Sequence, residues 1–261
     1  MEYLVICLVA VLVSTLSLVS GFGLGTVLMP AFALFFSVPM AVAATAVVHL
    51  ANNLFKLALV GKKADVGVVL RFALPGALAA VIGAALLNLF ADAPPLVAYH
   101  LFRGTHDVTL VKLVIGLLVV GFAAFDLVPK LNSLAFDRRY LPWGGLLSGF
   151  FGGLSGNQGA LRSAFLIKAG LDKEVFIGTG AVSSVIVDVA RLLVYGLSFY
   201  KTRFNVFRLK IGGLVLAAML AAFLGSFIGT RLVKKATLRT VQIIVGILLI
   251  TVGFGMAMGF F

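Results

Sequence analysis

The stretch SGFGLGTVLMP, residues 20–30, decides how the fold of this chain is interpreted. It follows the apolar run 3–20, which has the length of a bilayer-spanning helix of about 20 residues. Glycines at three alternate positions disfavour a helix, and irregular backbone persists in a bilayer only where protein or a water-filled cavity covers it. The stretch therefore predicts a helix broken within the membrane, and the new helix N-terminus at such a break attracts anions.

The composition of the whole chain supports a membrane protein. Of its 261 residues, 62% are hydrophobic and 11% are charged, and the mean hydropathy is +1.17. A soluble domain has about 25% charged residues, so a water-soluble fold and a disordered chain are both excluded. The length allows about eight spanning helices. We expect an all-α, polytopic helical bundle, with the lipid bilayer as a partner.

The net charge of +12 comes from basic residues in short loops. This distribution is typical of the positive-inside rule rather than of a nucleic-acid-binding surface, so we expect no nucleic-acid partner. Apolar runs predict helical elements over residues 3–20, 21–36, 40–60, 68–91, 109–128, 141–156, 158–170, 174–197, 207–232 and 239–260. The elements 21–36 and 158–170 are short for full crossings, so seven to ten crossings are compatible with the pattern. Residues 92–108 are expected to form the longest loop.

The sequence also indicates an internal repeat. A shift of 135 positions places Ser20-Gly21 on Ser155-Gly156 and Lys56 on Arg191 without a gap. We therefore predict two membrane repeats with broken or re-entrant helices, covering residues 1–130 and 131–261. The loop charges leave open whether the repeats are parallel or inverted, and we favour the inverted arrangement.

Each repeat contributes candidate anion ligands at its break. Amide groups supply donors, and the guanidinium of Arg162 has a fork that suits oxyanions. The alternatives are close packing of helices through small residues and an Arg162 that reaches the membrane surface. The candidate ligands at the two breaks are Gly21, Gly23, Gly25 and Thr26 in the first, and Ser155, Gly156, Asn157, Gln158 and Arg162 in the second.

Polar side chains also form a stripe on one face of the helix 40–60, at positions i, i+3, i+4 and i+7. The corresponding stripe in the second repeat contains an acid and a base at i and i+3 that can pair. Such stripes face the interior of a bundle, either as substrate ligands or as structural contacts between helices, and the basic groups could instead reach the membrane surface from helix ends. The stripe residues are His49, Asn52, Asn53 and Lys56, and Ser184, Asp188 and Arg191 with Ser183 beside them.

The sequence has no motif of a hydrolase, a nucleotide-binding site or a metal site, and its single Cys7 has no partner for a disulfide. We expect no catalytic residues, no metal and no cofactor. The alternative is a membrane-embedded enzyme or assembly factor that holds a lipid or a cofactor. It would need a titratable pair, for which the sequence offers only His49 and Asp188, the two groups that could also carry a proton.

The stretch 20–30, together with PMAVAAT at 39–45, GKKAD at 61–65, Pro75-Gly76 and Gly83, resembles the TauE/SafE sulfite exporter family, also called TSUP. The resemblance covers nearly the whole chain, but the second break departs from the family pattern. More glycine is usual at the positions of Asn157, Gln158, Ala160 and Arg162, and Phe165 stands where a proline is expected. It implies a secondary transporter of a prokaryotic cytoplasmic membrane. The implied substrate is a small sulfur-containing or organic anion, such as sulfite, sulfoacetate or another sulfonate, moved by alternating access and coupled to protons or the membrane potential. A homo-oligomer is one possibility that the sequence leaves open.

Overall fold

Apolar helices make up most of the computed structural model, which describes residues 1–20, 23–60, 63–101, 104–202, 211–232 and 238–260. Gly21 and Gly61 lie outside the described residues, as do the loop segments 203–210 and 233–237. The first half contains α1 (Glu2–Ser20), α2 (Leu24–Ala33), α3 (Val38–Val60), α4 (Val66–Phe90), β1 (Val97–Leu101), β2 (Gly104–Val108), α5 (Leu110–Leu127) and α6 (Pro129–Asn132). The second half contains η2 (Arg138–Tyr140), α7 (Leu141–Ser155), α8 (Gly159–Leu166), α9 (Lys173–Thr202), α11 (Gly212–Leu232) and α12 (Leu238–Ala257).

The chain is a multi-pass membrane protein with a helical bundle fold. Within the described residues, four helical segments are long and apolar enough to cross a bilayer, namely Val38–Ala58, Val66–Phe90, Lys173–Leu197 and Gly212–Gly229. Shorter apolar segments lie at Glu2–Ser17, Leu24–Ala33, Leu110–Phe125 and Val245–Ala257. Large apolar side chains point outward from these helices, as Leu78 does with 70% of its surface exposed. That outward apolar surface suits contact with lipid rather than with water.

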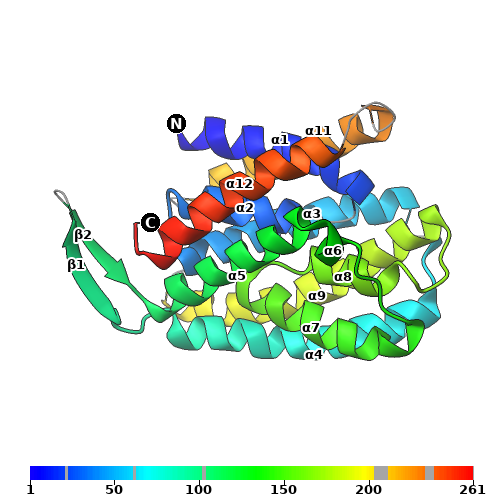
Figure 1. The fold of residues 1–261 in the computed structure, drawn as a ribbon, viewed down its shortest axis with the longest axis horizontal. Coiled ribbons are helices and arrows are strands. Elements are labelled where there is room, and N and C mark those ends of the chain that lie inside the picture. Colours follow the sequence, from blue (N-terminus) through cyan, green and yellow to red (C-terminus); the bar gives the residue numbers. More distant parts are fainter. Residues whose placement is uncertain (21–22, 61–62, 102–103, 203–210, 233–237, 261) are drawn as a thin grey trace.

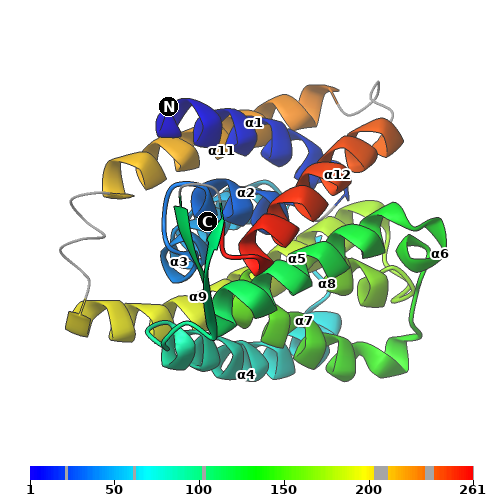
Figure 2. The ribbon, with the colours of Figure 1, turned by 60° about the vertical axis from the view of Figure 1, so that its left-hand side comes forward.

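Helices from the two halves pack in parallel pairs at the periphery of the bundle. α4 lies along α7, and α1 lies along α11 (Figures 1 and 2). Glycines allow the close approach: a Cβ atom on Gly145, Gly149 or Gly153 of α7 would collide with backbone carbonyls of α4. This spacing of four residues brings one stripe of α7 directly against the backbone of α4.

Two other pairs of helices run antiparallel. On α3 and α9, His49 contacts Asp188, whereas Lys56, further along α3, lines the same pocket as Ile177, which comes earlier in α9. α5 and α12 also run in opposite directions, because Gly116 lies against Ala257 and Leu127 lies against Gly246.

Element boundaries recur at the spacing of the predicted repeat. α1 ends at Ser20 and α7 at Ser155, α2 begins at Leu24 and α8 at Gly159, and α3 begins at Val38 and α9 at Lys173. All three pairs are 135 positions apart, which is the shift that aligns the sequence with itself.

The segment 92–108, expected to be a loop, instead contains an antiparallel hairpin. β1 and β2 pair Val97 with Val108, and the hairpin projects from one end of the bundle (Figure 1). The Tyr99 hydroxyl donates to the Met258 carbonyl over 2.6 Å, so the hairpin holds the C-terminal end of α12. The helix α9 also continues to Thr202, beyond the expected end at residue 197.

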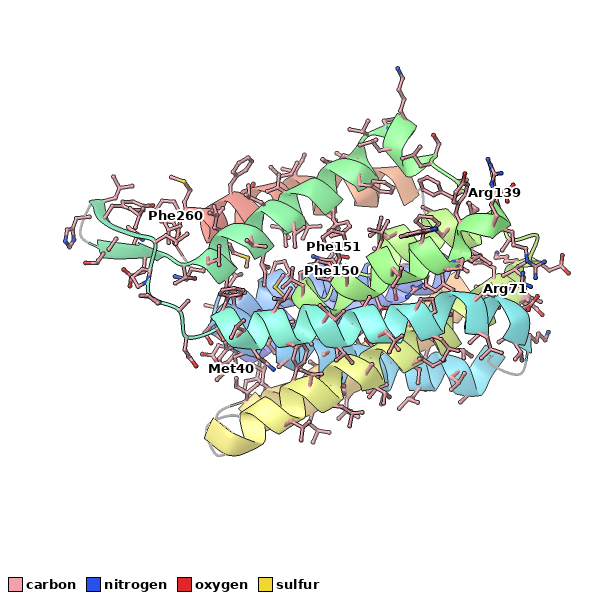
Figure 3. The ribbon with its side chains drawn as sticks, turned by 90° about the horizontal axis from the view of Figure 1, so that it is seen from below. Met40, Arg71, Arg139, Phe150, Phe151 and Phe260 are labelled. Carbon is pink, nitrogen blue, oxygen red and sulfur yellow. The ribbon has the colours of Figure 1, made fainter. Side chains whose placement is uncertain are left out.

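The two ends of the bundle differ in character. Arg71 and Arg139 lie at one end, and Met40 and Phe260 lie at the other (Figure 3). Ion pairs join elements at the charged end: Lys63 pairs with Glu174, and Arg138 lies 3.8 Å from Asp65. Asp65 also caps α4, because its side chain accepts a hydrogen bond from the Val68 amide.

Candidate functional site

The two helix breaks meet inside the bundle. Gly23 precedes α2 with φ of 115°, and Gly156 follows α7 with φ of 83°, both in the region that L side chains rarely adopt. A Cβ atom on Gly25 would lie only 2.6 Å from the Gly156 carbonyl oxygen. The first turn of α2 is therefore in direct backbone contact with the residue that ends α7, so the two breaks form one feature.

The second break is short. α7 remains helical through Gly152, Gly153 and Ser155, and only residues 156–158 separate it from α8. Ser155 is buried and donates to the Phe151 carbonyl of its own helix, so its hydroxyl is used locally. The glycines 152 and 153 continue the helix because the contact with α4 and α9 favours small residues there.

The Asp188 carboxylate is the centre of a buried hydrogen-bond network. Its Oδ2 lies 2.7 Å from His49 Nδ1 and accepts from Asn53 Nδ2 over 3.1 Å. Its Oδ1 accepts from Gln158 Nε2 over 3.0 Å and from Arg191 through Nε and NH2 over 3.0 and 2.7 Å. The predicted pairing of Asp188 with Arg191 is confirmed. Both side chains are 0% exposed, so the ion pair lies in the core of the bundle.

This network ties α9 to the end of α7. Arg191 donates through NH1 to the Gly152 carbonyl over 3.0 Å, and the Tyr195 hydroxyl donates to the Gly153 carbonyl. The Gln158 carbonyl in turn accepts from Ser148 over 2.9 Å. Tyr195 and Ser148 were missed by the sequence analysis. The position of Tyr195, four residues after Arg191 on the same helical face, was the available signal.

A small pocket of about 30 Å³ lies beside the network, toward the charged end of the bundle. The Lys56 ammonium donates to Ser17 Oγ over 2.9 Å, and the Arg162 guanidinium donates to Ser184 Oγ. Ser163 Oγ is buried without a hydrogen-bond partner. The pocket has room for about one or two waters, and it is lined by Ser17, Asn53, Lys56, Arg162, Ser163, Leu166, Phe176, Ile177, Gly180 and Ala181.

The buried charges do not balance. Among the described residues, the buried basic side chains are Lys56, Arg162 and Arg191, while the buried acid is Asp188. Lys56 is 8% exposed and Arg162 is 7% exposed, which is contrary to the interpretation that these groups extend to the membrane surface. The described lining of the pocket contains Lys56 and Arg162 and no acidic side chain, and burial of an excess of positive charge is costly without a counter-ion.

The other predicted site residues are buried near the Asp188 network but are not part of it. Asn52 accepts from Ser226 Oγ of α11 over 2.7 Å and so contacts a different helix from Asn53. Asn157 is buried, and neither its Oδ1 nor its Nδ2 has a hydrogen-bond partner. Ser183 Oγ is likewise buried without a partner, and Thr26 is buried in the first turn of α2. The prediction for Gly21 lies outside the described residues.

Comparison with known proteins gives one result about the family. The family model described as Sulfite exporter TauE/SafE matches residues 6–256 of the chain. The match covers both breaks, the network around Asp188 and the pocket. No curated protein and no solved structure gives a significant match to the chain.

Proposed function

Since the chain belongs to the sulfite exporter TauE/SafE family, we propose that it transports a small sulfur-containing or organic anion through the pocket between α1, α3, α8 and α9. Sulfite, sulfoacetate and other sulfonates are the proposed substrates. The excess of buried positive charge around Lys56 and Arg162 carries this proposal. A small oxyanion would neutralise that charge and would accept hydrogen bonds from both groups.

The polar side chains around the pocket favour an oxyanion over a cation. The Arg162 guanidinium presents donors in a planar fork, and the Lys56 ammonium presents up to three donors. The unpartnered Ser163 hydroxyl adds a further group that a ligand oxygen could satisfy. A cation in this pocket would face two positive side chains, with the Asp188 carboxylate already held by Arg191.

The arrangement of the halves supports transport by alternating access. We propose that residues 1–130 and 131–261 are inverted repeats, because three element boundaries recur at 135 positions and the pairs α3/α9 and α5/α12 are antiparallel. In such transporters, broken helices place a substrate site near the bilayer midplane, and one half rocks against the other. We further propose the cytoplasmic membrane as the location and a proton as the coupling ion, with His49 and Asp188 as its candidate carriers.

Transport of labelled sulfite into vesicles that contain the purified protein tests this function. The native chain is expected to move sulfite, and Arg162→Ala is expected to abolish the flux while leaving the yield of folded protein intact. Arg139→Ala is the matched control, because Arg139 is exposed at the charged end and stacks on Tyr140. Unchanged flux through Arg162→Ala shows that this side chain is not a ligand. Absence of flux for every tested anion, together with a tightly bound lipid or cofactor, favours the alternative of a membrane enzyme or assembly factor.

A further inference from the structure

The two central helices carry matching arrangements of side chains that differ in one charge. On α3, Lys56 follows Asn53 by three residues and donates to Ser17 of α1. On α9, Arg191 follows Asp188 by three residues and donates to the Gly152 carbonyl of α7. Ser17 and Gly152, Asn53 and Asp188, and Lys56 and Arg191 are each 135 positions apart. Each half therefore places a basic group against the preceding break, but only the second half places an acid beside it.

The environment of the two basic groups follows from this difference. The guanidinium of Arg191 is neutralised within its own helix, because Nε and NH2 both donate to Asp188 Oδ1. The corresponding neighbour of Lys56 is the Asn53 amide, which is neutral and donates its Nδ2 to Asp188 Oδ2. Asn53 and Lys56 both line the pocket, whereas Asp188 and Arg191 do not. The positive charge of Lys56 is thus available to a ligand, whereas that of Arg191 is compensated by Asp188.

We infer that Asn53 determines the charge selectivity of the pocket. The first half has an amide at the position where the second half has the Asp188 carboxylate. Lys56 can therefore bind an anion, whereas the corresponding basic group, Arg191, is already paired with Asp188. The inference rests on the proposed function and deepens it. A carboxylate at position 53 would pair with Lys56 as Asp188 pairs with Arg191, and the pocket would then repel an anion.

An exchange of the two side chains tests the inference with little change in shape. The double variant Asn53→Asp/Asp188→Asn keeps the net charge and the number of donors and acceptors, and it keeps a hydrogen bond between the two positions with its direction reversed. Sulfite binding to the purified, detergent-solubilised chain is measured by calorimetry and by the ligand-induced shift of the unfolding temperature. The double variant is expected to bind sulfite about tenfold or more weakly, because the carboxylate at position 53 pairs with Lys56. Its unfolding temperature without ligand is expected to fall, because the buried Arg191 loses the carboxylate at position 188.

Single variants provide the comparison and the control. Asn53→Asp alone is expected to weaken sulfite binding as the exchange does, but it adds a second buried acid that can impair folding. Asn88→Asp adds an acid on α4, where the Asn88 amide donates to the Val194 carbonyl, and it is expected to bind sulfite as the native chain does. Native affinity in either variant that carries aspartate at position 53 overturns the inference. Asn53→Asp, which keeps the Asp188–Arg191 pair, decides it where the double variant does not fold. Failure of the native chain to bind sulfite overturns the proposed function itself.

Discussion

Asn53 on α3 donates a hydrogen bond of 3.1 Å to Asp188 on α9, and both side chains are buried. The bond joins the two central antiparallel helices at the carboxylate that also holds Arg191 and Gln158. Asp188 is thus the point at which α3, α9 and the second helix break are linked. Its main effect is to fix these elements relative to one another, and the pocket beside it depends on that arrangement.

Replacing the Asp188 carboxylate should therefore destabilise the fold. In Asp188→Ala, the buried guanidinium of Arg191 loses its counter-ion, and breaking a buried pair in this way costs about 3–5 kcal/mol. The free energy of unfolding in detergent measures the loss. Asp172→Ala serves as the control, because Asp172 is exposed before α9 and the hydrogen bond from the Phe176 amide goes to its backbone carbonyl, which the substitution keeps. Equal stability of the two variants would show that the Asp188 network does not hold the helices together.

The glycine stripe of α7 makes a second prediction about stability. A Cβ atom on Gly149 would collide with the backbone of Gly76 in α4, so Gly149→Ala should lower the free energy of unfolding by about 1–3 kcal/mol. Gly121→Ala in α5 should instead raise it by up to about 1 kcal/mol, because nothing lies within 4 Å of that Cβ position and alanine is the better helix former. The two alanine variants are compared by the same unfolding assay, and a stabilising Gly149→Ala contradicts the close packing of α4 on α7.

The contact between the two breaks should matter for transport more than for folding. A Cβ atom on Gly25 would lie 2.6 Å from the Gly156 carbonyl and 3.8 Å from the His49 ring, so Gly25→Ala should push the breaks apart. We expect sulfite flux to fall by about tenfold or more, as a displacement of about 1 Å can cost a hundredfold where groups must be positioned accurately. Gly212→Ala, at an open position at the start of α11, is the control and should keep native flux. Native flux in Gly25→Ala would mean that contact between the breaks is not required.

Much of the fold follows from the sequence because apolar length and helix breakers are local signals. The predicted elements 109–128 and 141–156 agree to within one residue at each end with α5 (Leu110–Leu127) and α7 (Leu141–Ser155). The prediction of a loop over residues 92–108 was wrong, because the segment contains the β1–β2 hairpin. Strands of five residues carry only a weak alternation of apolar and polar residues, and the hairpin also depends on its contact with the end of α12.

The residues of the candidate site could be proposed from the sequence, but the contacts among them could not. The helical spacing of His49, Asn53 and Lys56 indicated a shared face, and the spacing of Asp188 and Arg191 indicated a pair. The sequence could not show that Asn52, one position from Asn53, contacts Ser226 of α11 instead. It also gave no sign that Lys56 would meet Ser17, because that contact joins residues 39 positions apart through the fold.

The most direct test of an oxyanion site at Lys56 and Arg162 is a crystal structure of the protein soaked with selenite, a heavier analogue of sulfite, with data collected at the selenium absorption edge. The selenium peak is expected in the pocket, within hydrogen-bonding reach of the Lys56 ammonium and the Arg162 guanidinium. In crystals of Lys56→Met that keep the native fold, the peak should be lost, whereas Lys63→Met should keep it, because Lys63 is exposed and pairs with Glu174 at the surface. A selenium peak at another place in a protein that transports sulfite contradicts the assignment of this pocket.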